Sequence, residues 1–358
     1  MLTIVIPNRN RNLRTVQKTL SSLVAQCKKG VRAVVVDYGS DLAYQEKLKV
    51  FIDSLNDIEI ILCPTQGQLW HKTRAINIAL SQCDTPYFMV ADMDMIFHPQ
   101  FVKKAIAMSS PESSVYFQVG IMTEHESSQD KDFKGYQVKF KTNDEATGIT
   151  LFPTEILKSI NGFDEFYHGW GAEDTDVHVR LRNAGHAVHF YDEECLFLHQ
   201  WHAKHYRSKK STAPFHPILE RVNHDYLKLT KSTGRVKANI QVDWGVFPSE
   251  AFYKDLKRPV DQLTVEATQE GVNAFLIQLT SNVFTSSLQV EFRPHLKIAS
   301  LKERIKKILG KKTSRFLAMS TVNELVLNTI ITQLRNKPYH YSFDQQKLLI
   351  SLKINLSE

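Results

Sequence analysis

The sequence predicts an α/β fold built around a mostly parallel sheet. Two observations support this prediction. Short apolar runs rich in β-branched residues alternate with amphipathic helical stretches in the N-terminal half, and polar residues gather where the apolar runs end. A length of 358 residues with 42% hydrophobic content is enough for one large domain with an appendage, or for two modest domains, which excludes a mainly disordered chain.

The expected elements alternate between strand and helix up to residue 97. Strands are expected at 2–7, 31–37, 58–64 and 87–94, and helices at 13–26, 43–55 and 71–81. In open α/β sheets, ligands bind at the carboxyl ends of the strands. We therefore expect the polar residues at these ends to face one crevice, namely Asn8, Arg9, Asp37, Asp92 and Asp94.

Beyond residue 97 the pattern is less regular. The segment SVYFQVGIM is a strand candidate, EHESSQDKD is an expected exposed loop, and residues 203–256 have no clear period. Residues 148–202, rich in glycine and tryptophan, are expected to form the other wall of the crevice. We predict one large domain over 1–256 in two halves, 1–97 and 98–256, followed by a mainly helical, basic region at 257–358.

The charge distribution argues against nucleic acid as a partner. Residues 1–256 hold 30 Lys and Arg against 30 Asp and Glu, whereas residues 257–358 hold 15 against 8, so the net charge of +7 lies in the C-terminal quarter. Four cysteines without a CxxC pair suit a reducing compartment. With no basic n-region ahead of an apolar stretch and no long apolar run, we expect a cytoplasmic protein.

The segment 300–312 is expected to be a basic amphipathic helix. Leu301, Ile305, Ile308 and Leu309 share one face, and lysine and arginine occupy the rest. One interpretation is a peripheral contact with the inner leaflet of the membrane, where lipid-linked acceptors are found. The other is that the apolar face packs on the catalytic domain or on a second subunit in a homodimer.

The sharpest local motif is ADMDM, in which Asp92 and Asp94 follow an apolar strand. Two carboxylates this close repel each other unless a cation lies beside them. Mn²⁺ and Mg²⁺ prefer oxygen ligands and commonly bridge to a substrate diphosphate. A lone DxD triplet is usually solvated surface, and it is the position after the strand YFMVA that favours the metal site.

A second motif is GFDEFYHGWGAEDTDVHVRL, in which Glu173 and Asp174 follow a Gly-Trp-Gly turn at the expected start of a helix. Negative charge is favourable there. The run of acids around Trp170, which also includes Asp164 and Asp176, suits a sugar ring, because an indole stacks on its apolar face while carboxylates bind its hydroxyls. An acidic helix start beside a core tryptophan is the alternative.

Two further motifs offer ligands for a metal and a phosphate. In LFLHQWHAKH, His199, His202 and His205 are spaced by three, and in a loop after a strand they could reach back to Asp94. A polar surface is the alternative. In PNRNR, Arg9 and Arg11 follow the first strand, where two guanidiniums can pair with a diphosphate or simply face solvent.

Together these motifs resemble the GT-A glycosyltransferases, both the family-2 enzymes of bacterial polysaccharide synthesis and the beta-1,4-galactosyltransferases with bacterial chondroitin polymerase. IPNRNR is similar to IPFRNR, VVVDYGS to VVDDGS and DMD to DVD. WHKTRAINIA resembles the helix before the DxD strand, with Lys72 and Asn77 at its polar positions. The segment that ends in GWGAEDTD is similar to the one that ends in GWGGEDDD. The resemblance covers about residues 1–205.

The resemblance implies a role for each matching residue. It assigns Asp174 as the catalytic base, Trp170 and Glu173 to the acceptor sugar, and Gly148 to a close approach to the donor sugar. His199 is the implied third protein ligand of Mn²⁺ (or Mg²⁺), with His202 as a competing alignment. Asp94 is a further implied metal ligand. The implied donor-binding residues are Pro7, Arg9, Arg11, Asp37, Lys72 and Asp92.

Three residues depart from the family pattern and leave the donor sugar open. Asn8 stands where the galactosyltransferases have an aromatic residue, Tyr38 where many family-2 enzymes have a second Asp, and Ala172 where GWGGED has a glycine. The implied activity is transfer of a hexose or N-acetylhexosamine from a UDP-sugar to a glycan or lipid-linked saccharide, with inversion at the anomeric carbon, in bacterial surface polysaccharide synthesis. A nucleotidyltransferase and a non-catalytic sugar-nucleotide-binding module are the alternatives.

Overall fold

The computed structural model describes residues 1–28, 30–203, 219–240, 242–247, 249–258, 261–281, 283–295, 308–310 and 314–357. These residues form two compact units. The first comprises the described residues of 1–63, 70–206 and 220–246, and the second those of 64–69 and 247–358. Each unit is described here by itself.

The first unit is built on a seven-stranded sheet in the order β10-β6-β9-β4-β1-β2-β3. β1 pairs in parallel with β2 and β4, and β2 with β3, whereas β9 is antiparallel to both β4 and β6. β6 and β10 are again parallel. The strands are β1 (Leu2–Asn8), β2 (Val31–Tyr38), β3 (Ile58–Cys63), β4 (Tyr87–Val90), β6 (Ser113–Phe117), β9 (Thr150–Pro153) and β10 (Ala187–Tyr191).

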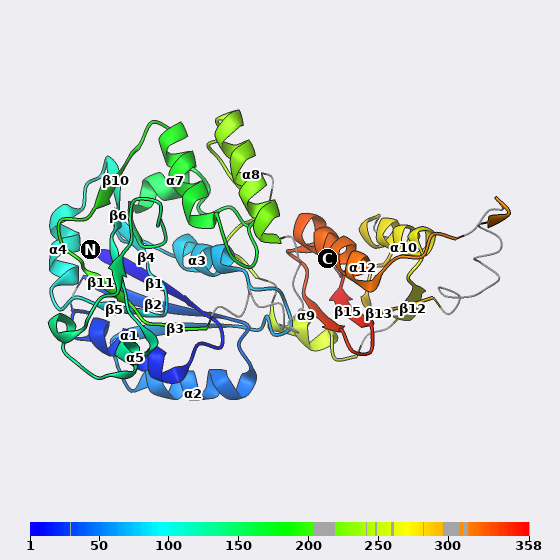
Figure 1. The fold of residues 1–358 in the computed structure, drawn as a ribbon, viewed down its shortest axis with the longest axis horizontal. Helices are drawn as coiled ribbons and strands as arrows, with labels where there is room; N and C mark the ends of the chain where they lie inside the picture. Colours follow the sequence, from blue (N-terminus) through cyan, green and yellow to red (C-terminus); the bar gives the residue numbers. More distant parts are fainter. Residues whose placement is uncertain are drawn as a thin grey trace. The chain divides into compact units, whose positions relative to one another are not determined.

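Helices cover both faces of this sheet. α1 and α2 lie on one face and α3 on the other (Figure 1), and every residue of β1 is accordingly buried. A strand buried on both faces is the reason that LTIVIP is continuously apolar rather than alternating. The helices of the first unit are α1 (Leu13–Val24), α2 (Leu42–Asp53), α3 (Lys72–Ser81), α4 (Phe101–Met108), α5 (Glu124–Ser128), α6 (Thr154–Ser159), α7 (Glu173–Asn183) and α8 (Leu219–Thr233), with a 3-10 turn η1 (Phe133–Gly135).

A second, smaller sheet in this unit has the order β5-β11-β7-β8. Its strands are β5 (Met95–Phe97), β7 (Val119–Ile121), β8 (Phe140–Lys141) and β11 (Phe197–His199). The segment SVYFQVGIM, expected to be one strand, is divided at Gln118 between the large sheet and the small one. β11 pairs with β5, the strand that begins directly after the DMD triplet.

The predicted α/β fold with a mostly parallel sheet is confirmed, and the expected strands and helices up to residue 81 are all present. The strand after them is shorter than predicted, because β4 ends at Val90 and the DMD triplet lies beyond it. The expected loop EHESSQDKD contains α5, whose start is capped by the Thr123 hydroxyl. The region without a clear period contains α8 and α9 (Glu250–Asp255).

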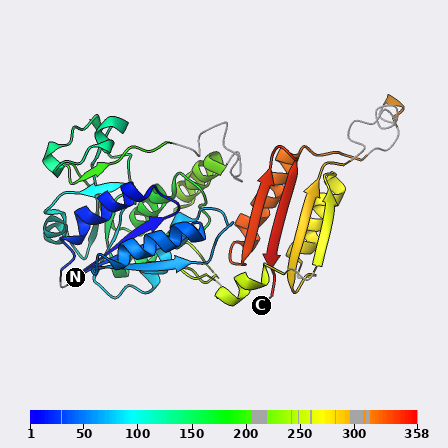
Figure 2. The same cartoon turned by 90° about the horizontal axis from the view of Figure 1, so that it is seen from below.

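The prediction of a mainly helical C-terminal region is wrong. The second unit holds a four-stranded sheet, β12-β13-β15-β14, with α10 (Gln269–Thr280) and α12 (Met319–Thr329) on one of its faces (Figure 2). α12 continues into a π-helical turn, η3 (Ile330–Leu334). Alternate apolar residues of the central strands, such as Val290 and Leu352, are fully buried, which is the period of a strand and not of a helix. The strands are β12 (Asp261–Glu266), β13 (Ser287–Arg293), β14 (Tyr339–Asp344) and β15 (Leu349–Asn355).

The segment 64–69 belongs to the second unit through its backbone. The Gly67 carbonyl accepts a hydrogen bond from the Tyr341 amide at 2.9 Å, and the Leu69 amide donates to the Tyr339 hydroxyl at 2.9 Å. The basic helix expected at 300–312 lies almost entirely outside the described residues, as does His205. In the part of the chain that is described, no helix has the length and apolar character needed to cross a bilayer.

Candidate active site

The ends of β1 and β2 meet in register at the edge of the large sheet. Asn8 lies opposite Asp37, and its amide nitrogen donates to the Asp37 carboxylate at 2.7 Å. Asp37 is fully buried and also accepts hydrogen bonds from Gln45 at 2.7 Å and from the amide and hydroxyl of Ser40 at 3.2 and 2.6 Å. Protein donors therefore surround this carboxylate, and its clearest role in the structure is to order the strand ends.

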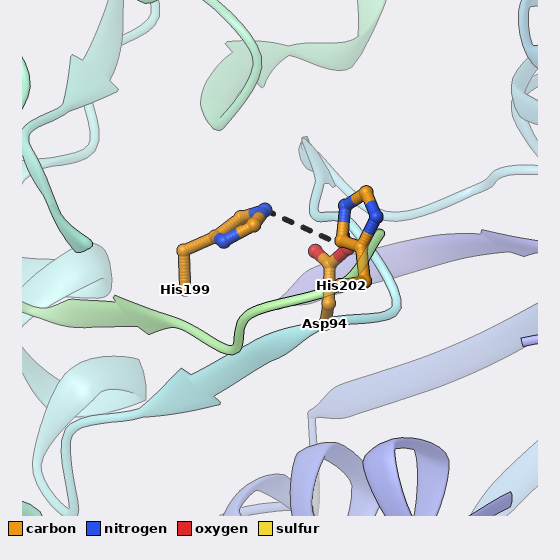
Figure 3. A group of neighbouring side chains, drawn as sticks. All are labelled: Asp94, His199 and His202. Carbon is orange, nitrogen blue, oxygen red and sulfur yellow. Dashed lines mark ion pairs between the residues drawn. The ribbon is translucent and has the colours of Figure 1, made fainter. Parts of the chain in front are cut away.

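Asp94, His199 and His202 form a cluster with the composition of a metal site (Figure 3). Their ligand atoms lie within 4.8 Å of one another, and Asp94 is almost completely buried. The Nε2 atoms of His199 and His202 are 3.7 and 3.3 Å from the Asp94 Oδ2. The resemblance left open which of the two histidines is the ligand, and the structure places both beside Asp94.

Antiparallel pairing of β5 with β11 assembles this cluster. The register places His199 opposite Met95, the residue after Asp94. The Gln200 amide then donates to the Asp94 carbonyl at 2.8 Å, and the Gln200 side chain reaches Thr19 in α1 at 3.1 Å. The loop that follows brings His202 to the same carboxylate from the other side.

The donor atoms of the cluster fit a divalent metal ion. Among the described residues, the Asp94 Oδ1 and the His199 Nδ1 are buried polar atoms without a hydrogen-bond partner. A buried atom of this kind costs free energy unless a further ligand satisfies it. One carboxylate and two imidazoles suit several divalent ions, so the set supports a metal without fixing its identity.

Arg11 contacts the same carboxylate. Its guanidinium lies 3.1 Å from the Asp94 Oδ2. Burial raises the pKa of Asp94, but the neighbouring His199, Arg11 and His202 lower it further, so its pKa lies below the ordinary value. The second arginine of the motif, Arg9, is half-buried just beyond β1. Arg11 of the PNRNR motif therefore contacts the DxD segment.

A second cluster surrounds Lys72, the first residue of α3. Its ammonium is 2.9 Å from the Asp174 Oδ2, 3.0 Å from the Asp92 Oδ1 and 3.6 Å from the Glu173 Oε1. All four side chains are largely buried except Asp92, which is 34% exposed. One positive charge is shared by three carboxylates from the DxD segment and the start of α7.

The excess of negative charge perturbs both Lys72 and Asp174. Burial lowers the pKa of Lys72, but the three carboxylates more than reverse this and hold it well above the ordinary value. Burial raises the pKa of Asp174, Lys72 opposes that shift, and Glu173 and Asp92 add to it, so the pKa lies well above that of an ordinary aspartate. Both directions follow from one cation facing three anions, and a carboxyl group with a raised pKa suits a general base.

Gly148 lies against both acidic segments. A Cβ atom at this position would be 3.3 Å from the Asp174 Oδ2 and 3.6 Å from the Asp92 Oδ2. The backbone thus passes directly beside the two carboxylates. The resemblance implied a close approach to the donor sugar here, and the structure adds a close approach to Asp174.

The Gly-Trp-Gly turn presents Trp170 and starts α7. Gly169, Gly171 and Ala172 all have positive φ, at 72°, 106° and 71°, and the indole between them is 42% exposed. The left-handed conformation favours glycine, so alanine at position 172 carries strain of about 1 kcal/mol. The Gly171 amide donates to the Glu173 Oε2 at 2.9 Å, which holds that carboxylate at the helix start.

Two acids of the same run have a structural role instead. Asp176 is fully buried, pairs with Arg180 at 2.6 Å and accepts from the Tyr167 hydroxyl at 3.1 Å. Asp164 pairs with Arg235 at 2.7 Å. Sequence alone does not separate these acids from Glu173 and Asp174, because the distinction depends on the contacts that Asp176 makes with Arg180 and that Asp164 makes with Arg235.

Sequence analysis missed the support that α8 gives to this turn. The Asn223 amide nitrogen donates to the carbonyls of His168 and Trp170 at 3.1 and 3.3 Å. Buried or half-buried residues recur along α8 at Val222, Asn223, Tyr226, Leu227 and Thr230. That helical spacing was the signal available in the sequence.

Comparison with known proteins supports the resemblance over both halves of the site. Residues 3–154 match the model of "Glycosyl transferase family 2", and residues 130–205 match that of the "N-terminal domain of galactosyltransferase". A curated relative, chondroitin sulfate synthase 3 of Mus musculus, is 22% identical over 192 residues, which are 50% of this chain and 21% of that protein. The chain therefore spans about a fifth of the length of that relative.

Solved structures with limited similarity include one protein from S. aureus and one from Pyrobaculum calidifontis. TarS of S. aureus in complex with UDP-GlcNAc has a TM-score of 0.45 and 16% identity, over 65% of this chain and 69% of that one. The mannosyltransferase PcManGT of Pyrobaculum calidifontis, in complex with GDP-Man and Mn²⁺, has a TM-score of 0.42 and 16% identity, over 65% and 71%. The recognition of a family-2-like glycosyltransferase domain of the GT-A type is confirmed by the family matches.

Proposed function

From the premise that residues 3–205 are a family-2-like glycosyltransferase domain, we propose that this protein transfers a hexose or N-acetylhexosamine from a UDP-sugar to a glycan acceptor, with inversion at the anomeric carbon. The observation that carries the proposal is the Lys72 cluster. It brings Asp92, from the DxD segment, to the same ammonium as Asp174, at the start of α7. Two segments 80 residues apart thus supply a donor side and a base at one place.

Asp174 acts as the general base in this proposal. Its carboxylate takes the proton of the acceptor hydroxyl while that oxygen attacks C1 of the donor sugar. The bond from C1 to the UDP oxygen breaks on the opposite side, so one displacement inverts the anomeric centre. Gly148 has no side chain and so keeps the space beside Asp174 and Asp92 free of a Cβ atom, which would lie 3.3 and 3.6 Å from their carboxylates.

The donor diphosphate is bound by cationic side chains. Arg11 and Lys72 are the described cations in contact with the DxD aspartates, and Arg9 follows the same strand. A divalent ion held by Asp94, His199 and His202, which we propose to be Mn²⁺ or Mg²⁺, would supply Lewis-acid stabilisation of the leaving diphosphate. Trp170 and Glu173 would hold the acceptor sugar, the indole by stacking and the carboxylate through hydroxyls.

The biological setting that this chemistry suits is synthesis of a bacterial surface polysaccharide, with a glycan or lipid-linked saccharide as the acceptor. The family matches favour a glycosyltransferase over a nucleotidyltransferase. A binding module without activity would not need a base with a raised pKa beside the donor carboxylate.

Release of UDP from a panel of donors tests the proposal. Purified protein is incubated with UDP-Gal, UDP-GalNAc, UDP-Glc, UDP-GlcNAc and UDP-GlcA, each with Mn²⁺ and with EDTA. We expect turnover of at least one donor that depends on the metal, since slow hydrolysis proceeds with water as the acceptor. Absence of both turnover and Mn²⁺-dependent UDP binding for every donor would contradict the proposal.

A further inference from the structure

Lys72 is hydrogen-bonded to one carboxylate oxygen of Asp174, the residue proposed as the base. The lysine donates a hydrogen bond of 2.9 Å to the Asp174 Oδ2, and the Gly148 backbone lies against the same oxygen. The lysine side chain is only 13% exposed and that of Asp174 17%. Because Lys72 contacts this oxygen directly, an acceptor hydroxyl cannot approach the same oxygen, so this arrangement is not the one in which that hydroxyl loses its proton.

The same ammonium also contacts the donor side of the site. It lies 3.0 Å from Asp92, whose carboxylate is the most exposed of the three. Lys72 is the first residue of α3 and has a flexible four-carbon stem, so its ammonium can move while its backbone stays fixed. A diphosphate arriving beside Asp92 brings two negative charges within reach of this cation.

We infer that Lys72 is a lock on the base: without donor its ammonium is held on Asp174, and the donor diphosphate draws it away, so that Asp174 becomes free only when the donor is bound. This inference rests on the proposed function and concerns the same site. It makes Lys72 a positioning residue that couples donor binding to proton acceptance. It also predicts that part of the donor's binding free energy is used to break the contact between Lys72 and Asp174.

A double-mutant cycle on UDP affinity tests the lock without an acceptor or turnover. Binding of UDP in the presence of saturating Mn²⁺ is measured by calorimetry for the full-length wild type, Asp174→Asn, Lys72→Met and the double variant. If donor binding breaks the contact, Asp174→Asn tightens UDP binding at least about fivefold when Lys72 is present. In the Lys72→Met background the same change alters the affinity less than about twofold.

The Lys72→Met background distinguishes release of Lys72 from the mere loss of a negative charge near the diphosphate. Removing a negative charge near a diphosphate tightens binding to some degree in any background, whereas release of Lys72 requires the lysine. Equal tightening in both backgrounds would overturn the inference, and so would unchanged or weaker UDP binding by Asp174→Asn. Circular dichroism checks folding, and Lys72→Gln replaces Lys72→Met if the latter does not fold.

The outcome also distinguishes the lock from the proposed function. If all four proteins bind UDP but the cycle shows no coupling, the donor site stands and the lock is wrong. If none of the folded proteins binds UDP with Mn²⁺, the proposed function itself fails, and the lock fails with it.

Discussion

At the residue scale, Glu173 and Asp92 help to set the pH at which Asp174 can accept a proton. Burial raises the pKa of Asp174, Lys72 opposes it, and the two carboxylates raise it again. A base must be deprotonated, so activity falls as the pH drops through this raised pKa. The acid limb of the rate profile should therefore lie well above the range of an ordinary aspartate.

Glu173→Gln should move this acid limb to lower pH. The substitution removes a like charge from Asp174, which favours the ionised carboxylate and lowers its pKa. The measurement is the pH dependence of kcat/KM for the donor, which reports groups of the free enzyme. Glu155→Gln, an exposed change in α6, is the matched control. A limb that stays in place or rises in Glu173→Gln would speak against the assigned electrostatics.

His199 and His202 should each be needed for metal affinity. Either change to Ala removes one of the three ligand atoms of the cluster formed by Asp94, His199 and His202. We expect the Kd for Mn²⁺, measured by calorimetry, to rise about tenfold or more. His189→Ala, on the exposed face of β10, should leave it unchanged. Full Mn²⁺ affinity in His202→Ala would leave His199 as the sole histidine ligand and would contradict the three-residue site, although it agrees with the first assignment that the resemblance implied.

At the scale of elements, α7 carries Asp174, the proposed base, and a structural acid, Asp176, two residues further on. Asp176 is fully buried and paired with Arg180, also fully buried, so Asp176→Ala leaves a buried guanidinium without its main partner. The free energy of unfolding should fall by about 3–5 kcal/mol in urea. Asp174→Asn, on the same helix, should change it far less, because Asp92 and Glu173 still neutralise Lys72. Similar losses in both variants would contradict this division of roles.

The elements that the sequence predicted well are those in which local pattern and burial agree. β1 and β2 are continuous apolar runs because helices cover both faces, and the Gly-Trp-Gly turn marks the start of α7. α8 was missed because polar residues such as Asn223 lie among the apolar ones on its buried side, which weakens the apolar helical period. Its position depends on a contact with a distant segment, which no local pattern contains.

Only part of the metal cluster was predictable from the sequence, because the cluster also depends on contacts between distant segments. The spacing of His199 and His202 allowed either or both to reach Asp94. The choice depends on the register of β5 with β11, which places His199 opposite Met95 and turns the next loop back toward the carboxylate. The roles of Lys72 and Gly148 came from the family resemblance, but their contact with Asp174 required the fold.

At the scale of the whole molecule, the two units differ in charge. The net positive charge lies in residues 257–358, where strands as well as helices form the fold. The charged residues of this region lie between apolar residues that follow a helical period in some segments and a strand period in others. A basic composition therefore did not distinguish its strands from its helices. The charge itself remains a basis for a peripheral contact with an anionic membrane, which we propose for 300–312.

Vesicle binding tests that proposal. Full-length protein should co-sediment with vesicles containing anionic lipid, and binding should fall steeply with salt. A variant with Lys306, Lys307, Lys311 and Lys312 changed to Gln should lose most of this binding, since each lysine near the surface contributes about 1 kcal/mol. Binding that is unchanged in the variant would favour the alternative, in which the segment packs against protein.

The central claim is that Asp174 is the base of a glycosyltransferase. The most direct test compares Asp174→Asn with wild type, using the donor identified in the panel, for UDP release and for UDP affinity with Mn²⁺. The account predicts that release falls by about 10²–10⁴-fold while UDP still binds at least as tightly as in wild type. UDP release by Asp174→Asn at the wild-type rate, with UDP binding intact, would contradict it.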